Sequence, residues 1–263
     1  KGPYIKVESV ATALKDIAEF YRKQLSCKII GITGSVGKTS TKDIIASVLS
    51  QKYDVLKTEG NLNNQIGLPL TLLRLKNHTA IVLEMGMGNL GEISKLSKTA
   101  EPTLAVVTNI GTSHIGNLGS RENILKAKLE ILDGLSSEGK LIINNDNDLL
   151  HTYYEKNKTD KILPYGIENS SSLVPTNIVC NKDNSTFDIT LNNQKYTITV
   201  PVSGKHFIYN SLAAVLVGLQ LDIPISNIIS GIQKFTLTKS RMEVIHAKNN
   251  ITIINDAYNA SYD

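Results

Sequence analysis

Short apolar runs alternate along most of the chain with segments whose apolar positions recur every three or four residues. The runs predict strands at residues 28–33, 53–58, 79–85, 103–109 and 140–145. The recurring segments predict helices at about residues 39–51, 66–76, 91–99, 121–135, 147–156, 206–221 and 225–234. Strands that are apolar on both faces and alternate with helices indicate a mostly parallel sheet covered by helices on both sides.

Three segments lie outside this alternation. The strings STFDITL and QKYTITV, within residues 172–202, alternate with period two around Asn192-Asn193 and predict a small antiparallel hairpin. Residues 251–256 predict one more strand, and residues 9–25 predict an amphipathic helix. The apolar stripe of that helix consists of Val10, Leu14, Ile17 and Tyr21. The expected fold class is therefore α/β, with a small antiparallel β subdomain beside the parallel sheet.

Composition narrows the class of protein. Of the 263 residues, 41% are hydrophobic and 20% are charged, which predicts a folded core and not a disordered chain. The formal charge of +4 comes without a dense Lys/Arg cluster, so we expect no nucleic-acid partner. The two cysteines, Cys27 and Cys180, are far apart and predict neither a disulfide scaffold nor a zinc site. With no long apolar run and no secretory signal, we expect a cytoplasmic protein without a membrane span.

The strongest local motif is GITGSVGKTS, residues 31–40, which follows a predicted strand and opens a predicted helix. This context is typical of a phosphate-binding loop, in which glycines let the backbone approach phosphates and the helix N-terminus supplies N–H groups. Lys38 is expected to reach the phosphates and Thr39 to offer its hydroxyl to Mg²⁺. The strict G-x-x-x-x-G-K-[ST] pattern is not met, because Ile32 stands at its first glycine. An ordinary capped glycine turn is the alternative.

Polar side chains follow the other predicted strands where ligands bind in open parallel sheets. The second strand leads to EGNLNNQIG, with Asn61, Asn63 and Asn64, and the third ends in Glu84. The fourth leads to Asn109 and His114. A carboxylate and an imidazole suit a second cation beside the Mg²⁺ of a nucleotide. The alternatives are a capped loop histidine, a helix-capping or surface carboxylate, and turn-forming asparagines.

A lysine stands at an unexpected position on the predicted helix 121–135. Lys128 falls in the middle of the apolar stripe, whereas Lys126 falls almost opposite. The stripe consists of Ile124, Leu125, Ile131, Leu132 and Leu135. A buried lysine is costly unless it is paired or uncharged, so Lys128 is a candidate functional residue. Its alternative is a lysine that reaches out past its neighbours into water.

Taken together, these strings resemble the Mur ligases, ATP-dependent enzymes that join amino acids or peptides to peptidoglycan precursors. The similarity is greatest to the branch that adds D-alanyl-D-alanine. The matching strings are GITGSVGKTSTKD, GNLNNQIGLPLTLL, EMGMGNLGEI, TNIGTSHIGNLGSRENILKAKLEIL, SGKHFIYNSLAA, SRME and INDAYNAS. The resemblance implies the tail of an N-terminal domain with a connecting helix at 1–27, a central ATP-binding domain at 28–255, and a hinge to a further domain at 256–263.

The resemblance also implies site residues. The catalytic set is Lys38, Glu84, His114 and Lys128. The nucleotide set is Gly34, Ser35, Val36, Gly37, Lys38, Thr39, Ser40, Asn210, Arg241 and Asp256. Asn63 and Asn64 bind substrate. Two Mg²⁺ sites draw on Thr39, Glu84, His114 and a carbamylated Lys128. Phe207 departs from the family, which usually has asparagine after the motif histidine, here His206.

The implied reaction is the ATP-dependent addition of D-Ala-D-Ala to UDP-MurNAc-tripeptide through an acyl phosphate. We expect a monomer, and we expect this chain alone to bind nucleotide without making product. The alternatives are another Mur-type or cyanophycin-synthetase-type ligase, a nucleotide-binding module without ligase activity, and a simple phosphate-loop kinase.

Overall fold

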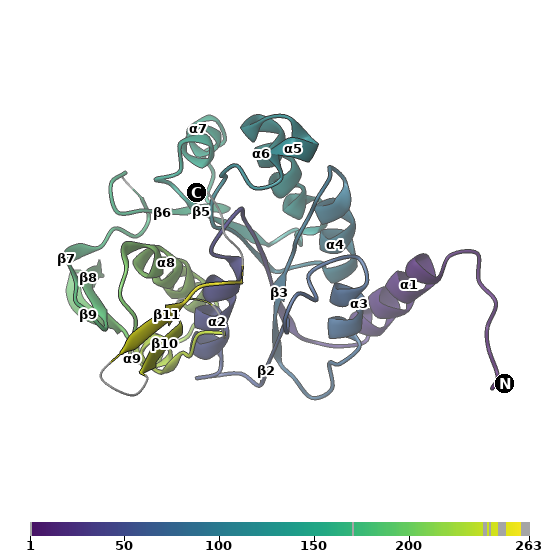
Figure 1. Cartoon of the computed structure of the whole chain (residues 1–263), viewed down its shortest axis with the longest axis horizontal. Coiled ribbons are helices and arrows are strands. Elements are labelled where there is room, and N and C mark those ends of the chain that lie inside the picture. Colours follow the sequence, from purple (N-terminus) through teal and green to yellow (C-terminus); the bar gives the residue numbers. More distant parts are fainter. Residues whose placement is uncertain (1, 170, 239–240, 242, 247–250, 259–263) are drawn as a thin grey trace.

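The computed structural model describes residues 2–169, 171–238, 241, 243–246 and 251–258. Its centre is a six-stranded parallel sheet with the order β2-β3-β1-β4-β5-β6 (Figure 1). The strands are β1 (Lys28–Thr33), β2 (Val55–Lys57), β3 (Ala80–Glu84), β4 (Leu104–Val107), β5 (Lys140–Asn144) and β6 (Ile162–Tyr165). The predicted parallel sheet is confirmed. The sequence did not predict the edge strand β6, which is short and contains Pro164; an edge position tolerates the missing N–H.

Helices cover both faces of this sheet because alternate strand residues point to opposite sides. On one face, Ile30 and Val82 pack with α2 (Lys38–Leu49), α8 (Lys205–Gln220) and α9 (Ile225–Lys234). On the other face, Ile29 and Ile81 share a core with the remaining helices. These are α1 (Val10–Lys23), α3 (Gly67–Leu72), α4 (Glu92–Ala100), α5 (Ile115–Leu118), α6 (Arg121–Leu129), the 3-10 helix η1 (Glu130–Gly134) and α7 (Asp148–Lys156).

Two small antiparallel sheets complete the described structure. The predicted hairpin is β8 (Ser185–Leu191) and β9 (Gln194–Val200), and β7 (Thr176–Cys180) adds a third strand. Its turn residues Asn192 and Asn193 both have positive φ, at 49° and 62°, as a tight two-residue hairpin requires. The predicted last strand is β11 (Thr252–Asn255), which pairs with β10 (Glu243–His246), a strand that the sequence did not predict. Of the predicted hinge at residues 256–263, residues 259–263 lie outside the described residues.

Two helix predictions need correction. The helix that carries Lys128 ends at Leu129 and continues as the 3-10 helix η1, not as α-helix to residue 135. The predicted apolar stripe of α1 is only partly buried, because Val10 and Ile17 are 77% and 58% exposed, whereas Tyr21 packs against the core. Ala18 is also buried, and buried Arg22 pairs with Glu101 at 2.8 Å. In the part of the chain that is described, no helix is long and apolar enough to cross a membrane.

Candidate active site

The phosphate loop joins the end of β1 to the start of α2. Gly37 precedes the first helical residue in a left-handed conformation with φ 80°, and Gly34 has φ 152°. A Cβ atom at Gly34 would lie 1.9 Å from Thr108 Oγ1, so only glycine fits at this point. Beyond Gly37, the first turn of α2 presents backbone N–H groups that have no intrahelical acceptor. The loop therefore has the geometry of an anion site at a helix N-terminus.

The loop is supported from the side by residues that follow β4. Asn109 Oδ1 accepts hydrogen bonds from the backbone N–H groups of Ser35 at 3.0 Å and Val36 at 2.9 Å. Thr108 Oγ1 donates to the Val36 carbonyl at 2.6 Å, and the Gly111 N–H donates to Ser35 Oγ at 2.9 Å. The N–H groups of Ser35 and Val36, both predicted to bind nucleotide, are thus directed at Asn109. The backbone N–H groups of residues 37–40 are therefore the ones left to bind a ligand.

Lys38 lies folded over this loop. Its amine donates to the carbonyls of Gly34 at 2.8 Å and Ser35 at 3.2 Å. Burial lowers the pKa of Lys38, nearby Glu84 opposes that shift, and Arg241 adds to it. An amine held among carbonyls at the centre of an anion site is placed to exchange these neutral partners for phosphate oxygens.

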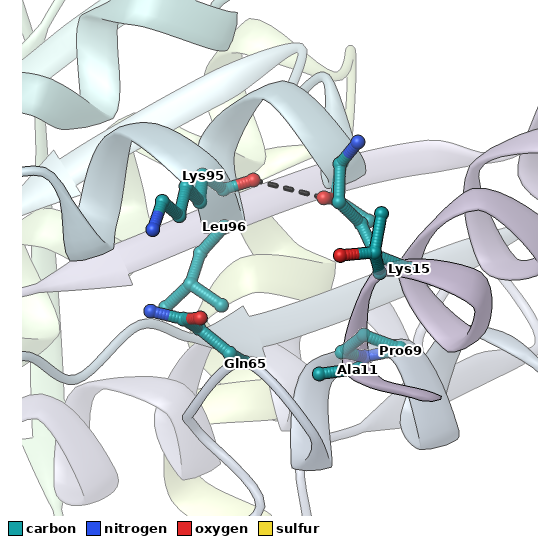
Figure 2. Close-up of a pocket in the computed structure, with 8 residues that line it drawn as sticks. Ala11, Lys15, Gln65, Pro69, Lys95 and Leu96 are labelled. Atoms are coloured by element: carbon teal, nitrogen blue, oxygen red, sulfur yellow. Dashed lines mark hydrogen bonds between the residues drawn. The ribbon is translucent and has the colours of Figure 1, made fainter. Parts of the chain in front are cut away.

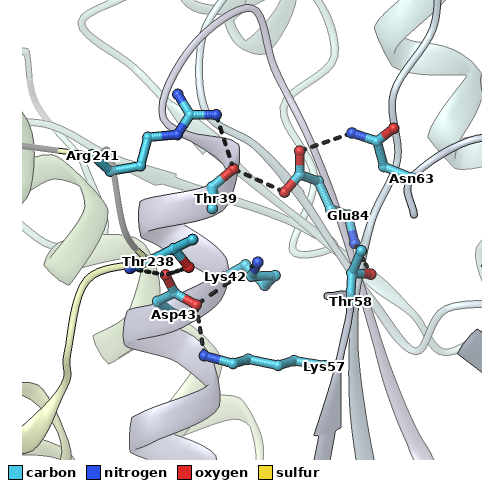
Figure 3. Close-up of polar contacts among 9 residues, drawn as sticks. All are labelled: Thr39, Lys42, Asp43, Lys57, Thr58, Asn63, Glu84, Thr238 and Arg241. Atoms are coloured by element: carbon cyan, nitrogen blue, oxygen red, sulfur yellow. Dashed lines mark hydrogen bonds and ion pairs between the residues drawn. The ribbon is translucent and has the colours of Figure 1, made fainter. Parts of the chain in front are cut away.

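A chain of hydrogen bonds connects α2 to the strand ends on its other side (Figure 3). Thr39 Oγ1 donates to Glu84 Oε2 at 3.0 Å, and Asn63 Nδ2 donates to Glu84 Oε1 at 3.0 Å. Arg241 Nη2 approaches Thr39 Oγ1 at 3.4 Å, and its guanidinium lies 4.1 Å from the centre of the Tyr258 ring. Glu84 is 3% exposed, and its backbone N–H donates to the hydroxyl of Thr58, the residue after the neighbouring strand β2, at 3.0 Å. The carboxylate is therefore held firmly beside the phosphate loop.

The four residues of the predicted catalytic set line one hollow of about 450 Å³, which we call the central cavity. Its wall includes Lys38, Asn61, Asn63, Asn64, Glu84, Glu92, His114, Lys128, Arg241 and Tyr258. A smaller hollow, the loop cavity, is lined by residues 35–40 and Arg241. Lys38 and Arg241 line both cavities. The two side chains therefore stand where the loop site opens into the central cavity.

Lys128 and His114 lie on the wall of the central cavity that α5 and α6 form. Lys128 is 2% exposed, and Lys126 is exposed to solvent, as the helical wheel predicted. Burial holds the pKa of Lys128 well below its usual value, and the charge of Lys38 lowers it further. Within the described residues, no carboxylate forms an ion pair with Lys128. His114 has φ 68°, and its pKa is lowered by burial and then by Lys128 and Lys38. Both side chains therefore favour their neutral forms.

The oxygen donors beside the central cavity are too few to bind a cation alone, but they suit a cation that also has ligands from outside the protein. Among the described residues, no three His, Cys, Asp or Glu side chains gather closely enough to hold a metal by themselves. The Thr39 hydroxyl and the Glu84 carboxylate, 3.0 Å apart, are oxygen donors of the kind that Mg²⁺ prefers. A Mg²⁺ ion at this position would need phosphate oxygens or water for the rest of its coordination.

Some predicted residues lie apart from the two cavities. Asn210 is buried, with Oδ1 facing Gly37 from behind the loop. Asp256 is exposed and acts electrostatically on His206, and neither residue lines a cavity described above. Phe207 is 1% exposed and packs in the core near Phe235, so its side chain is not presented to a ligand. The departure from the family at this position is a core substitution.

The sequence did not assign roles to several residues that the structure places in or next to the site. Asn109 was noticed only as a strand-end residue, although it supports the loop. Glu92, which accepts the Gly88 N–H at 2.8 Å, lines the central cavity, and its only sequence signal was its position in the first turn of a predicted helix. Asp43, one helical turn after Thr39, is buried and forms the lower set of contacts in Figure 3.

A separate hollow of about 270 Å³ lies between α1, α3 and α4 (Figure 2). Ala11, Lys15, Gln65, Pro69, Lys95 and Leu96 contribute to its wall. None of the predicted site residues lines it, although Gln65 follows Asn64 in the chain. The candidate site is therefore the pair of cavities at the carboxyl ends of β1, β3 and β4.

Comparison with known proteins supports this choice. The sequence profile described as the Mur ligase middle domain matches residues 32–218. The UDP-N-acetylmuramoyl-tripeptide–D-alanyl-D-alanine ligase of Bacillus subtilis (strain 168) is 42% identical over 259 residues, which cover 98% of this chain and 55% of that protein. The chain thus spans about half the length of this relative.

Solved structures give the same result. A crystal structure of MurF from Acinetobacter baumannii superposes with a TM-score of 0.91 at 32% identity, covering 98% of this chain and 56% of that one. The MurF ligase from Thermotoga maritima in complex with ADP superposes with a TM-score of 0.88 at 28% identity, covering 98% and 59%. The fold around the candidate site is therefore shared with proteins whose names state a ligase and, in one case, a bound nucleotide.

Proposed function

This chain belongs to the Mur ligase family, and from that premise we propose that it forms the ATP-binding part of an enzyme that joins D-alanyl-D-alanine to UDP-MurNAc-tripeptide. The observation that carries the proposal is the junction of the two cavities. There, the phosphate-loop residue Thr39 is hydrogen-bonded to Glu84, and Lys38 and Arg241 line both cavities. The similarity to named D-alanyl-D-alanine ligases over 98% of the chain supports the choice of substrates.

The reaction proceeds in two steps that this geometry can serve. The carboxylate of the tripeptide attacks the γ-phosphorus of ATP, which forms an acyl phosphate and releases ADP. The amine of D-Ala-D-Ala then attacks the acyl carbon, loses a proton, and expels inorganic phosphate through a tetrahedral intermediate. In such transfers the protein contributes mostly positioning and neutralisation of charge. Lys38 and Arg241 supply positive charge, and the loop N–H groups orient the phosphates.

Two cation sites form part of the proposal. The Thr39 hydroxyl and Glu84 would hold the Mg²⁺ of the nucleotide, and Glu84, His114 and Lys128 would hold a second Mg²⁺. A Mg²⁺ ion supplies charge neutralisation to transferring phosphoryl groups. Lys128 fits this role only after it loses its ammonium proton, because an ammonium has no lone pair with which to bind a metal. A neutral, buried amine can react with CO₂ and release a proton to give a carbamate, and its lowered pKa favours the neutral form.

The wall of the central cavity opposite the phosphate loop carries the polar side chains of Asn63 and Asn64. We propose that Asn63 and Asn64 contact the substrate there, since both line the cavity opposite the phosphate loop. Asn63 is oriented by its hydrogen bond to Glu84. Asn64 Oδ1 accepts the N–H groups of Ile66 and Gly67, at 3.0 and 2.9 Å, which leaves its amide nitrogen as the group available to substrate. We place the reaction in the cytoplasm, where ATP and UDP-linked precursors occur, and propose a monomer.

Calorimetry with Lys38→Ala tests the nucleotide site. The protein from the complete reading frame that encodes this chain should bind ATP with Mg²⁺, and Lys38→Ala should weaken binding by about tenfold or more, as loss of a hydrogen-bonded charge predicts. Its unfolding temperature should stay close to wild type, because Lys38 serves the ligand and not the core. Equal affinities in the two proteins would show that the loop is not the phosphate site.

A ligation assay tests the substrates. The same protein is incubated with ATP, Mg²⁺, UDP-MurNAc-tripeptide and D-Ala-D-Ala, and the pentapeptide product is measured by mass together with ADP. Lysine and meso-diaminopimelate serve as competing acceptors with the shorter precursor. Product only with the latter acceptors would favour another Mur-type ligase. Nucleotide binding without any product would favour a non-catalytic module.

A further inference from the structure

A buried carboxylate outside both cavities ties three separated segments together. Asp43 lies on α2, one turn after Thr39, and is 2% exposed. Its Oδ1 accepts from Lys57 Nζ at 2.7 Å, at the end of β2. Its Oδ2 accepts from both the backbone N–H and the hydroxyl of Thr238, at 3.1 and 2.7 Å. Figure 3 shows these contacts below the Thr39–Glu84 pair.

The segment that Asp43 holds is the one that leads to Arg241. Thr238 precedes Arg241 by three residues, and Arg241 reaches Thr39 Oγ1 at 3.4 Å. Thr39 and Asp43 are four residues apart and therefore lie on the same face of α2. Thr238 and Arg241, which both follow α9, therefore contact α2 at two neighbouring points, Asp43 and Thr39.

Arg241 lies outside the elements that flank it. Among the described residues it follows α9 and precedes β10, and it belongs to neither. Its side chain stands at the junction of the loop cavity and the central cavity. A terminal phosphate at that junction would be met by the guanidinium only while the preceding residues remain attached to α2.

We propose that Asp43 is a positioning residue of the nucleotide site: by holding Thr238, it sets the reach of Arg241 toward the terminal phosphate of ATP. The inference rests on the proposed function, since it presumes that a nucleotide occupies the phosphate loop. Asp43 touches neither cavity described for the ligand except through Thr238 and Arg241, so it acts through other residues and not on the nucleotide itself.

A carboxylate suits this position because every group that faces it is a donor: the Lys57 amine, the N–H and hydroxyl of Thr238, and the Lys42 amine, which lies 3.8 Å from Oδ1. An asparagine would have to direct its own NH₂ group at Lys57 or at Thr238, and one donor would lose its acceptor. Lys57 supplies the positive charge that a buried carboxylate needs. Asp43→Asn is therefore a disruptive variant, whereas Thr238→Val removes one hydroxyl, keeps the shape of the side chain, and leaves the Lys57 pair intact.

The test compares affinities for two nucleotides by calorimetry with Mg²⁺, on the protein from the complete reading frame. The ligands are ADP and a non-hydrolysable ATP analogue, and the variants are Thr238→Val, Asp43→Asn, Arg241→Ala and the double variant Thr238→Val/Arg241→Ala. We expect Thr238→Val to weaken binding of the triphosphate about fivefold and binding of ADP less than about twofold, within what one hydrogen bond to a charged group provides. Asp43→Asn should act in the same direction and more strongly.

The double variant separates positioning from general stability. If Thr238 acts through Arg241, the double variant should bind the triphosphate no more weakly than Arg241→Ala alone. Thr197→Val is the matched control, because Thr197 Oγ1 donates to Asp188 Oδ1 at 2.6 Å in the three-stranded sheet, away from both cavities. It should leave both affinities at wild-type values.

Three results would overturn the inference. These are an equal loss for ADP and the triphosphate, additive losses in the double variant, or unchanged affinities in Thr238→Val and Asp43→Asn. Any of them, with normal nucleotide binding by the wild type, leaves the proposed function standing. A wild-type protein that binds neither nucleotide overturns the proposed function and this inference together.

Discussion

Replacement of Asn109 by alanine tests whether the phosphate loop depends on its support from β4. The change removes the side-chain acceptor of the Val36 N–H at 2.9 Å, whereas the Ser35 N–H keeps the backbone carbonyl of residue 109 at 3.1 Å. A buried donor left unpaired costs about 1–3 kcal/mol. The Val36 N–H is only partly buried, so water recovers part of this cost, and the expected loss is about 1 kcal/mol.

Two measurements report this loss. A domain of this size loses roughly 2–4 °C in unfolding temperature per kcal/mol, so Asn109→Ala should unfold about 2–4 °C below wild type without nucleotide. The loop would also spend less time in its binding conformation, and about 1 kcal/mol corresponds to at most about a fivefold weaker affinity for ATP with Mg²⁺. Asn157→Ala is the control, because Asn157 Nδ2 donates to the Tyr153 carbonyl on an exposed helix end far from the loop.

Asn109→Asp separates support of the loop from the electrostatics of binding. A carboxylate keeps acceptors for both N–H groups, so the unfolding temperature should remain near wild type. It adds a negative charge beside a loop that we propose holds a polyanion, so ATP affinity should fall about tenfold or more. The reasoning is refuted if Asn109→Ala changes neither quantity, or if the aspartate variant is as destabilised as the alanine variant.

Two further predictions follow from buried or paired charges. In the ligation assay, Lys128→Ala should lose most activity and Lys126→Ala should keep it, because Lys128 lines the central cavity and Lys126 is exposed to solvent. Small carboxylates should partly restore the activity of Lys128→Ala. Near wild-type turnover of that variant would contradict the carbamate proposal. The Lys195 amine, with Thr197 and Asn177, lowers the pKa of Asp188 from 3.8 to about 2, so the stability that Asp188 adds is present above about pH 4 and is lost as the pH falls toward 2. The difference in the free energy of unfolding between wild type and Asp188→Asn, measured in urea, should therefore shrink between pH 4 and pH 2.5. A constant difference would contradict the lowered pKa of Asp188.

The sequence by itself determined the features that depend on neighbouring residues in the chain. The period of apolar positions predicted the parallel sheet, its helices and the β8–β9 hairpin, because burial on one or two faces follows directly from that period. The glycines of the phosphate loop and the buried position of Lys128 were visible for the same reason. A spacing of a few residues fixes which side of a helix a side chain occupies.

Only the tertiary structure decided which distant residues meet. Asn109 supports Ser35 from 74 positions away, and Asp43 holds Thr238 from 195 positions away. The buried side of α1 includes Ala18 and Tyr21 but not Val10 and Ile17, so its apolar stripe predicted the buried side only in part. In each case the partner is chosen by where the sheet order β3-β1-β4 and the surrounding helices bring the chain together. Such contacts leave no periodic pattern along the sequence. Each buried polar group needs a hydrogen-bond partner, and the folded chain supplies that partner from a distant segment.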